Sequence, residues 1–314
     1  MGTLALHDPS PGVVDWLLEG DPAVRWQVLA DLLDAPQAEV SAARALVATQ
    51  GWGSALLARQ DPDGGWAHSL YSPKYTSTTY TLLLLQRLGL PPGDERALTG
   101  VRRLWDGATF TDGGLTLAIS IGLPEACITS MLVGLAAGFG LRDQRLPAAV
   151  EWLLRAQLPD GGWNCRSVRD GSRHGSFHTT ILALEGLLAY SRTGGAVPVE
   201  APMEEGRRFL LEHSLCRSHR SGEIVDPRYL RMPFPPGWHY DVVRALEHFR
   251  AAGAPPDPRM QDGVDAIERL RLTGGRWPRH VPYSGKYWFT LEPAGPSRLA
   301  TLRALRILRW WQSG

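Results

Sequence analysis

The amino-acid sequence predicts an all-α protein in which six pairs of helices close into a single (α/α)6 toroid. Two observations lead to this prediction. Apolar residues recur with helical spacing in six strongly apolar segments, which alternate with more polar amphipathic segments. A short element with the pattern Gly-Gly-Trp also recurs along the chain. Internal repeats indicate a repeated structural unit, so we expect one architecture throughout.

The apolar segments are predicted to form the inner helices of the toroid. Several open with Ser, Thr or a nearby Pro and several close with Gly, which are helix start and stop signals. In chain order they are Asp21–Leu33, Ser77–Leu90, Glu125–Gly140, Ser176–Tyr190, Trp238–Gly253 and Ser297–Trp311. Strand signals are weak, and we expect one domain over residues 1–314 with an extended tail at residues 1–12.

The more polar segments are predicted to form outer helices with one solvated face. They read AARALVATQ, RALTGVRRLW, AAVEWLLRAQ, MEEGRRFLLEH and DGVDAIERLRL. Linkers from inner to outer helices are short, whereas those from outer to inner helices span roughly fifteen to twenty-five residues, a length typical of functional loops. In a toroid all the long loops gather at one end, around the starts of the inner helices. This end is the candidate active face.

The Gly-Gly-Trp element occurs as DGGW ending at Trp66 and Trp163, and in degraded form as DGGL ending at Leu115 and GGRW ending at Trp277. The Asp favours a turn, the glycines permit a tight backbone, and the Trp is suited to packing between helices. We therefore predict that these tryptophans are structural staples.

Composition excludes several classes of function. The net charge of +1 in 314 residues gives no reason to expect a nucleic-acid partner or a membrane surface. The chain shows no signal peptide and no apolar run long enough for a transmembrane segment. Three cysteines do not make a disulfide framework, so a cytoplasmic location is expected. P-loop, dinucleotide-binding, HExxH and GxSxG motifs are absent from the sequence.

Three metal-ligating residue types stand near the starts of consecutive inner helices, namely Cys127, His178 and His239. Equivalent positions on successive helices of a toroid form one layer, and Cys165 follows Trp163 at the same end. Zinc binds thiolates and imidazoles in tetrahedral geometry, and helix N-termini favour thiolates. The sequence therefore predicts a zinc site formed by Cys127, Cys165, His178 and His239.

Two carboxylates are alternative ligands or partners that orient a ligand, Glu125 beside Cys127 and Asp241 beside His239. The third cysteine, Cys216, is expected to be a buried core residue.

Polar and aromatic residues at the same end predict a substrate site. Arg25 and Arg298 begin the first and sixth inner helices, where cations together with helix N-termini suit an anion such as diphosphate. Further substrate-binding candidates are Lys74, Tyr75, Tyr80 and Trp238. Asp241 and Tyr240 are the acid–base candidates.

Two copies of the repeat, QDPDGGW at Gln60–Trp66 and QLPDGGW at Gln157–Trp163, resemble the QW-type repeats of squalene–hopene cyclases and the related repeats of protein prenyltransferase β subunits. Those families share the (α/α)6 toroid, and the resemblance extends from Asp21 to Trp311. It implies an isoprenoid or other hydrophobic substrate and a metal at this place in the toroid.

The chain also departs from both families. It lacks the Asp-x-Asp-Asp acid motif and the second toroid of the squalene cyclases. The prenyltransferases bind zinc through Asp, Cys and His and need an α subunit. This sequence does not indicate whether a partner subunit is needed. We therefore expect a zinc-dependent transferase-like or cyclase-like enzyme. A metal-free terpenoid cyclase and a non-catalytic binding protein with structural zinc remain open.

Overall fold

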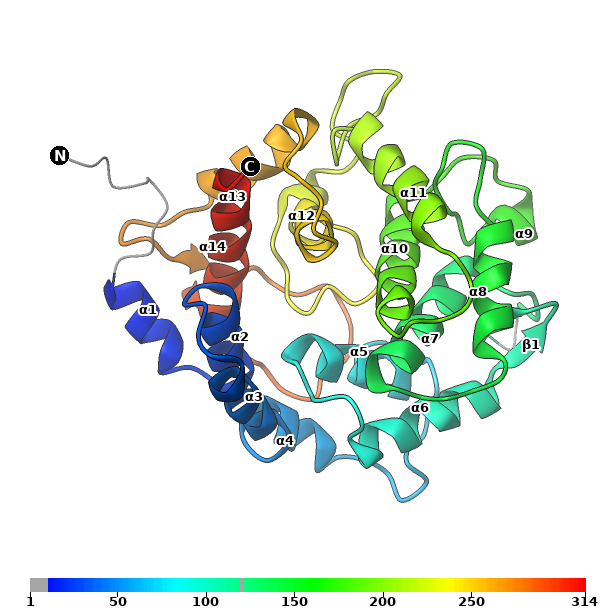
Figure 1. The fold of residues 1–314 in the computed structure, drawn as a ribbon, viewed down its shortest axis with the longest axis horizontal. Coiled ribbons are helices and arrows are strands. Elements are labelled where there is room, and N and C mark those ends of the chain that lie inside the picture. Colours follow the sequence, from blue (N-terminus) through cyan, green and yellow to red (C-terminus); the bar gives the residue numbers. More distant parts are fainter. Residues whose placement is uncertain (1–10, 119–120) are drawn as a thin grey trace.

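The structure of this chain is a computed structural model that describes residues 11–118 and 121–314. The described residues form a ring of helices with only short strands, which confirms the all-α prediction (Figure 1). The tail expected at residues 1–12 lies outside the described residues as far as residue 10, and helix α1 begins at Pro11.

Every segment expected as an inner helix contains one. These helices are α2 (Pro22–Asp31), α5 (Thr78–Leu88), α7 (Ala126–Phe139), α10 (Phe177–Ser191), α12 (Val242–Ala251) and α14 (Arg298–Gln312). Neighbouring inner helices contact each other from α5 through α7, α10, α12 and α14 to α2. The indole Nε1 of Trp26 on α2 donates to the Leu88 carbonyl oxygen at the end of α5 at 2.9 Å, which closes the ring.

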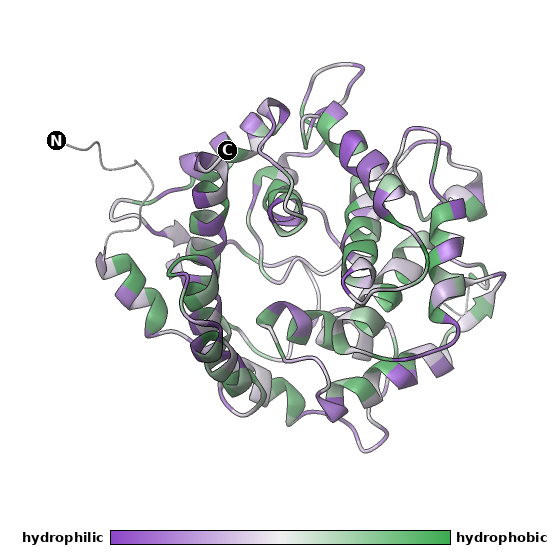
Figure 2. Cartoon of the chain, viewed as in Figure 1, coloured by the Kyte–Doolittle hydropathy of each residue, from purple (hydrophilic) through white to green (hydrophobic). Residues whose placement is uncertain are grey.

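An outer helix or helix pair precedes each inner helix along the chain. The outer helices are α1 (Pro11–Leu18), α3 (Gln37–Ala45), α4 (Gly51–Leu57), α6 (Glu95–Gly107), α8 (Leu146–Arg155), α11 (Glu200–Glu212) and α13 (Gln261–Arg269). Figure 2 shows mainly hydrophobic residues on the inner helices α7 and α10 and hydrophilic residues on the outer helices α6 and α11. This division follows the two kinds of segment in the sequence.

Short elements lie in the connections. The single-turn helices are η1 (Leu46–Ala48), α9 (Ser167–Asp170), η2 (Pro227–Leu230) and η3 (Pro258–Met260). Two antiparallel pairs of strands are β1 (Thr109–Thr111) with β2 (Gly114–Thr116), and β3 (Trp277–Pro278) with β4 (Pro296–Ser297). Among the described residues, no helix is both long and apolar enough to cross a membrane.

The repeated tryptophans are fully buried and make the same two hydrogen bonds each time. Each indole donates to a carbonyl ten residues earlier in the chain: Trp66 to Leu56, Trp163 to Leu153 and Trp277 to Ile267. Each backbone N–H donates to a buried threonine hydroxyl on the next inner helix: Trp66 to Thr78, Trp163 to Thr180 and Trp277 to Thr301. The tryptophans therefore join each outer helix to the inner helix that follows.

The degraded copy at Leu115 keeps the backbone half of this staple, because its N–H donates to the hydroxyl of Thr129 at 2.9 Å. The glycines of the first good copy have a steric role. Gly64 has φ of +84°, and a Cβ on Gly65 would lie 2.9 Å from the Thr78 hydroxyl that holds the staple. The repeat is thus explained by packing.

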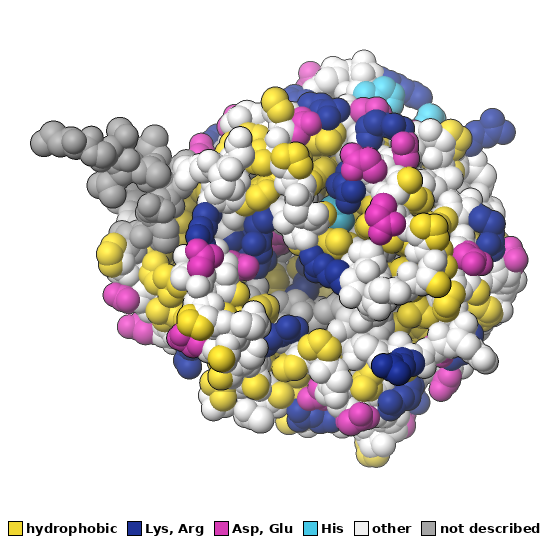
Figure 3. Space-filling model, viewed as in Figure 1, with side chains coloured by type: hydrophobic (Ala, Val, Ile, Leu, Met, Phe, Trp, Pro, Cys, Tyr) yellow, Lys and Arg dark blue, Asp and Glu magenta, His cyan; other side chains and the backbone are white. Residues whose placement is uncertain are grey.

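The centre of the ring is charged. The Glu185 carboxylate on α10 is shared by the guanidinium groups of Arg87 on α5 and Arg244 on α12, at 3.0 and 2.6 Å. A second carboxylate, Glu247 on α12, binds Arg303 and Arg306 of α14. Figure 3 shows that this face is hollowed at its centre and that Lys and Arg side chains gather around the hollow. Covering these ion pairs with a hydrocarbon would carry a desolvation cost.

Candidate active site

A long loop between β3 and β4 crosses one end of the ring. This loop, residues 279–295, is called the strap below, and its ends are joined by the pairing of Trp277 with Ser297. Its far side reaches α5, where the indole Nε1 of Trp288 donates to the hydroxyl of Thr81 at 3.0 Å. The Tyr287 ring stacks on Tyr75, with centroids 4.6 Å apart. The strap therefore lies among the loops that precede the inner helices, at the expected active face.

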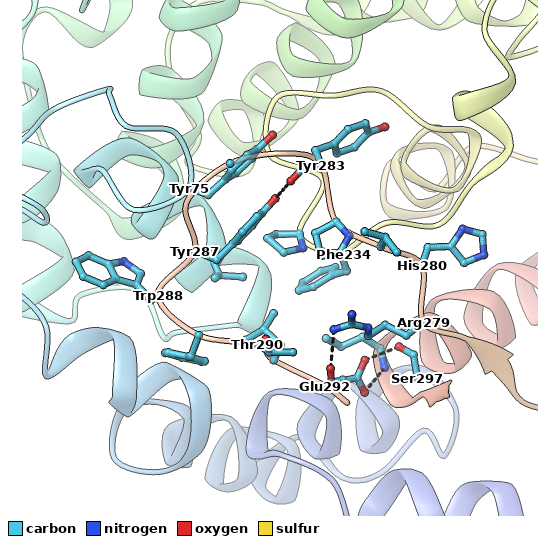
Figure 4. Close-up of a pocket in the computed structure, with 18 of the residues that line it drawn as sticks. Tyr75, Phe234, Arg279, His280, Tyr283, Tyr287, Trp288, Thr290, Glu292 and Ser297 are labelled. Atoms are coloured by element: carbon cyan, nitrogen blue, oxygen red, sulfur yellow. Dashed lines mark hydrogen bonds between the residues drawn. The ribbon is translucent and has the colours of Figure 1, made fainter. Parts of the chain in front are cut away.

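A cavity of about 340 Å³ lies beneath the strap (Figure 4). This volume is at the small end of the roughly 300–1,000 Å³ typical of ligand pockets. Its aromatic wall consists of Tyr75, Phe234, Tyr283, Tyr287, Trp288 and Phe289. Aliphatic side chains, among them Leu56, Leu84 and Leu299, complete the lining. The wall is suited to an apolar ligand and presents aromatic rings to any cation that forms inside.

The charged groups of the cavity wall are already paired within the protein. The Glu292 carboxylate accepts the Arg298 backbone N–H at 2.7 Å and the Ser297 hydroxyl, and so caps the start of α14. The Arg279 guanidinium donates to the Glu292 carbonyl oxygen at 2.8 Å (Figure 4). The ends of the strap are therefore fixed by polar contacts, and the aromatic wall faces the cavity.

A second group of reactive side chains lies at the starts of α7 and α10. One carboxylate oxygen of Glu125 and the sulfurs of Cys127 and Cys165 all lie within 4.8 Å of one another. Glu125 is buried, whereas both thiols are partly exposed. We call these three residues the thiol cluster; it is the one group of three or more metal-ligating side chains at this spacing in the described chain.

A hydrogen bond between the two thiols shifts their pKa values in opposite directions. The Cys127 thiol donates to the Cys165 sulfur, and this bond, together with burial, raises the pKa of Cys127 well above its ordinary value. The same bond lowers the pKa of Cys165 to about 6, although burial opposes it. Burial also raises the pKa of Glu125. Cys165 is therefore the sulfur that ionises first.

The two histidines of the predicted zinc site lie together but outside the thiol cluster. The rings of His178 and His239 are 5.9 Å apart between centroids, and both pack on Trp238. His178 accepts the Tyr240 backbone N–H at Nδ1, at 2.8 Å. Burial lowers the pKa of each histidine to about 4, so both rings are neutral at pH 7.

Aromatic rings connect the thiol cluster with the cavity. Burial raises the pKa of Tyr71 to about 12, a hydrogen bond to Tyr80 opposes this, and the charges of the thiol cluster add to the rise. The Tyr71 ring is 5.6 Å from Tyr80, which is 5.3 Å from Tyr75 in the cavity wall. Tyr75 also reaches the Nδ1 of His239 through its hydroxyl, at 3.3 Å. Tyr71, Tyr80 and Tyr75 thus form one row of contacting aromatic rings, of which Tyr75 lines the cavity.

The predicted anion clamp faces helix α1. The Arg25 guanidinium donates to the carbonyl oxygens of Leu18 and Gly20, and Arg298 donates to that of Trp16 at 2.7 Å. Neither side chain lines the cavity. Lys74 lies 4.7 Å from the Trp238 ring centroid in a cation–π contact. In this structure Arg25 and Arg298 hold α1 to the ring.

The acid–base candidates are both fully buried. Asp241 caps α12, with Oδ1 accepting the Arg244 N–H at 2.8 Å, while its Oδ2 has no hydrogen-bond partner among the described residues. Burial raises the pKa of Asp241 to about 6, against the nearby charge of Arg303. The Tyr240 hydroxyl donates to the Leu215 carbonyl oxygen. Neither residue lines the cavity.

Sequence reasoning did not select Phe234, Tyr283 or Glu292. The last two belong to the strap, and Phe234 lies in the long loop before α12, at a cis Phe234–Pro235 peptide bond. The length of these two loops and their aromatic content were the available signals. Cys216 is fully buried, which confirms the prediction for the third cysteine.

No protein-family model matches this chain, and no curated protein matches its sequence. Among solved structures it is similar to a protein from Actinoplanes, with 19% identity and a TM-score of 0.48, over 96% of this chain and 97% of that one. It is also similar to the type II terpene cyclase MstE from Scytonema without ligand, with 17% identity and a TM-score of 0.44, over 92% of this chain and 88% of that one.

A substituted form of MstE from Scytonema, in complex with its substrate geranylgeranyl dihydroxybenzoate, matches with 16% identity and a TM-score of 0.44. The match covers 94% of this chain and 87% of that one. Structures similar to this chain therefore include a type II terpene cyclase.

Proposed function

We propose that this protein is a terpenoid-cyclase-like enzyme that takes an isoprenoid or similarly apolar substrate in the cavity beneath the strap. One observation carries the proposal, namely the cavity of about 340 Å³ with six aromatic side chains in its wall. Aromatic faces attract cations, and the aromatic and aliphatic part of the lining suits an apolar ligand. The charged centre of the ring supports the same choice of site, because it leaves the strap cavity as the apolar alternative.

Asp241, which does not line the cavity, is proposed to act on the cavity through Tyr283 and not as a direct proton donor to the substrate. Among the described residues its Oδ2 is buried and has no hydrogen-bond partner, so a proton can be held there. Tyr283 of the cavity wall interacts electrostatically with this carboxyl group. In an Asp241→Asn variant we expect turnover to be lost while binding of the apolar substrate is retained. Loss of binding together with a lower melting temperature would instead indicate a purely structural role.

The thiol cluster is proposed to hold a zinc ion. Two sulfurs and a carboxylate oxygen at this spacing match the ligands of zinc, and three protein ligands leave a fourth position open. A bound zinc would supply Lewis-acid chemistry at that position. Here the carboxylate of Glu125 replaces the two histidines of the sequence prediction.

Two measurements test the proposal. A polyprenyl compound should bind the wild type and fail to bind a Leu84→Trp variant, whose indole fills the cavity; equal binding to both would refute the proposed site.

Elemental analysis should find zinc lost in Cys165→Ser and retained in a His178→Ala variant. Zinc retained in Cys165→Ser would refute the thiol cluster as ligand set. Turnover that survives zinc removal would favour a metal-free cyclase, and bound zinc without turnover a binding protein.

A further inference from the structure

We propose that Cys127 and Cys165 form a reversible intramolecular disulfide, which makes the thiol cluster a site of oxidation by small disulfides of the glutathione type. The observation is the position of the two sulfurs, which lie within 4.8 Å of each other in the reduced protein. Disulfide formation stands on this geometry alone. Its consequence for a metal rests on the proposed function.

The two cysteines lie in different kinds of backbone, one in a long helix and the other in an irregular segment. Cys127 is the second residue of α7, the helix that packs most extensively against α10. Cys165 lies in the irregular segment between Trp163 and α9, where its backbone N–H donates to the Thr179 hydroxyl at 3.3 Å. A disulfide needs about 2.05 Å between the sulfurs. We infer that rotation of the Cys165 side chain, with an adjustment of its loop, brings the two sulfurs to this distance while α7 stays in place.

Access from solvent separates this pair from the third cysteine. Cys127 and Cys165 are both partly exposed, whereas Cys216 is fully buried. We therefore expect a soluble disulfide to react with Cys165 before Cys216. Because each chain contains its own unreactive thiol, Cys216 serves as an internal reference for oxidation of the other two.

The exchange balances in two steps. Deprotonated Cys165 attacks one sulfur of oxidised glutathione, whose S–S bond breaks; one glutathione leaves as a thiolate and takes up a proton. Cys127 then loses its proton to solvent and attacks the Cys165 sulfur of the mixed disulfide, which releases the second glutathione. Two protein thiols are oxidised, and one glutathione disulfide is reduced to two thiols.

The disulfide would remove the thiolates of the cluster. A sulfur in a disulfide has no charge with which to bind a metal ion, so two of the three proposed ligands are lost together. Glu125 alone would not retain zinc. Oxidation would therefore release the metal, and reduction would restore the site.

The experiment incubates the metal-free full chain with mixtures of oxidised and reduced glutathione, followed by thiol blocking and intact-mass measurement. After blocking under denaturing conditions, we expect the oxidised wild type to carry one blocking group and the reduced wild type three. An unblocked oxidised sample should be lighter than the reduced chain by two hydrogen atoms. Peptide mapping should join Cys127 to Cys165. A Cys127→Ser variant should instead stop at the mixed disulfide and gain one glutathione, and a Cys216→Ser variant should behave as the wild type. Thermal melts verify that each variant is folded.

A wild type that retains all three thiols, or accumulates glutathione adducts without the internal bond, would overturn the proposal. The same samples loaded with zinc separate this result from the proposed metal. Formation of the disulfide in a chain that never binds zinc supports the redox pair and refutes the metal site. Zinc binding in a chain that forms no Cys127–Cys165 disulfide supports the metal site and refutes the redox pair.

Discussion

Glu185 holds two arginines at the centre of the ring, and its replacement by Gln should destabilise the fold by on the order of 3 kcal/mol at pH 7. Burial raises the pKa of this carboxyl group, but the charges of Arg244 and Arg87 outweigh burial and lower it from 4.5 to about 2. A difference of this size corresponds to about 3 kcal/mol. Arg244, whose side chain is 1% exposed, would lose its carboxylate partner in the variant.

The stability that Glu185 contributes should depend on pH. Because the folded pKa lies below the unfolded one, the stabilisation is complete above about pH 4.5 and is lost as the pH falls toward about 2. Urea unfolding followed by circular dichroism should therefore show a gap between wild type and Glu185→Gln that narrows over this range. The matched control is Glu204→Gln, an exposed partner of Arg207, with an expected loss below about 1 kcal/mol. A gap for Glu185→Gln no larger than the control, or one independent of pH, would refute the reasoning.

Three further predictions follow from the staples, the cavity and the hold on α1. Thr180→Val removes the acceptor of the buried Trp163 N–H and should cost about 1–3 kcal/mol in urea unfolding, whereas the exposed Thr99→Val should change stability little. Leu84→Trp should abolish binding of a polyprenyl compound in a fluorescence titration while leaving zinc content unchanged. Arg298→Ala should loosen α1, seen as faster amide exchange over residues 11–18, with substrate affinity unaltered.

The helices could be predicted from the sequence because their signals are local. The six inner helices match the apolar segments since helical spacing and terminal glycines act over a few residues, as at Gly89 and Gly140, which close α5 and α7 in the left-handed conformation. The structural role of Trp66 and Trp163 could also be predicted from the sequence. The same Asp-Gly-Gly turn precedes both tryptophans and places each of them against the next inner helix.

The grouping of Glu125 with Cys127 and Cys165 could not be predicted in the same way. Cys127 and His178 are both the second residue of their helices, yet packed helices are about 8–10 Å apart, whereas ligands of one zinc ion bind at about 2.0–2.3 Å. Equivalent positions are therefore too far apart unless side chains turn toward each other. Cys165 meets Cys127 because its loop lies between the two helices, and the position of the strap over Tyr75 is likewise decided by tertiary contacts.

The most direct test of the central claim is a crystal structure of this protein grown with an unreactive isoprenoid analogue. The account predicts electron density for the hydrocarbon chain beneath the strap, against Phe234, Tyr287 and Leu84. A hydrocarbon chain bound in the charged hollow at the centre of the ring, or a saturating analogue that leaves the strap cavity empty, would contradict it.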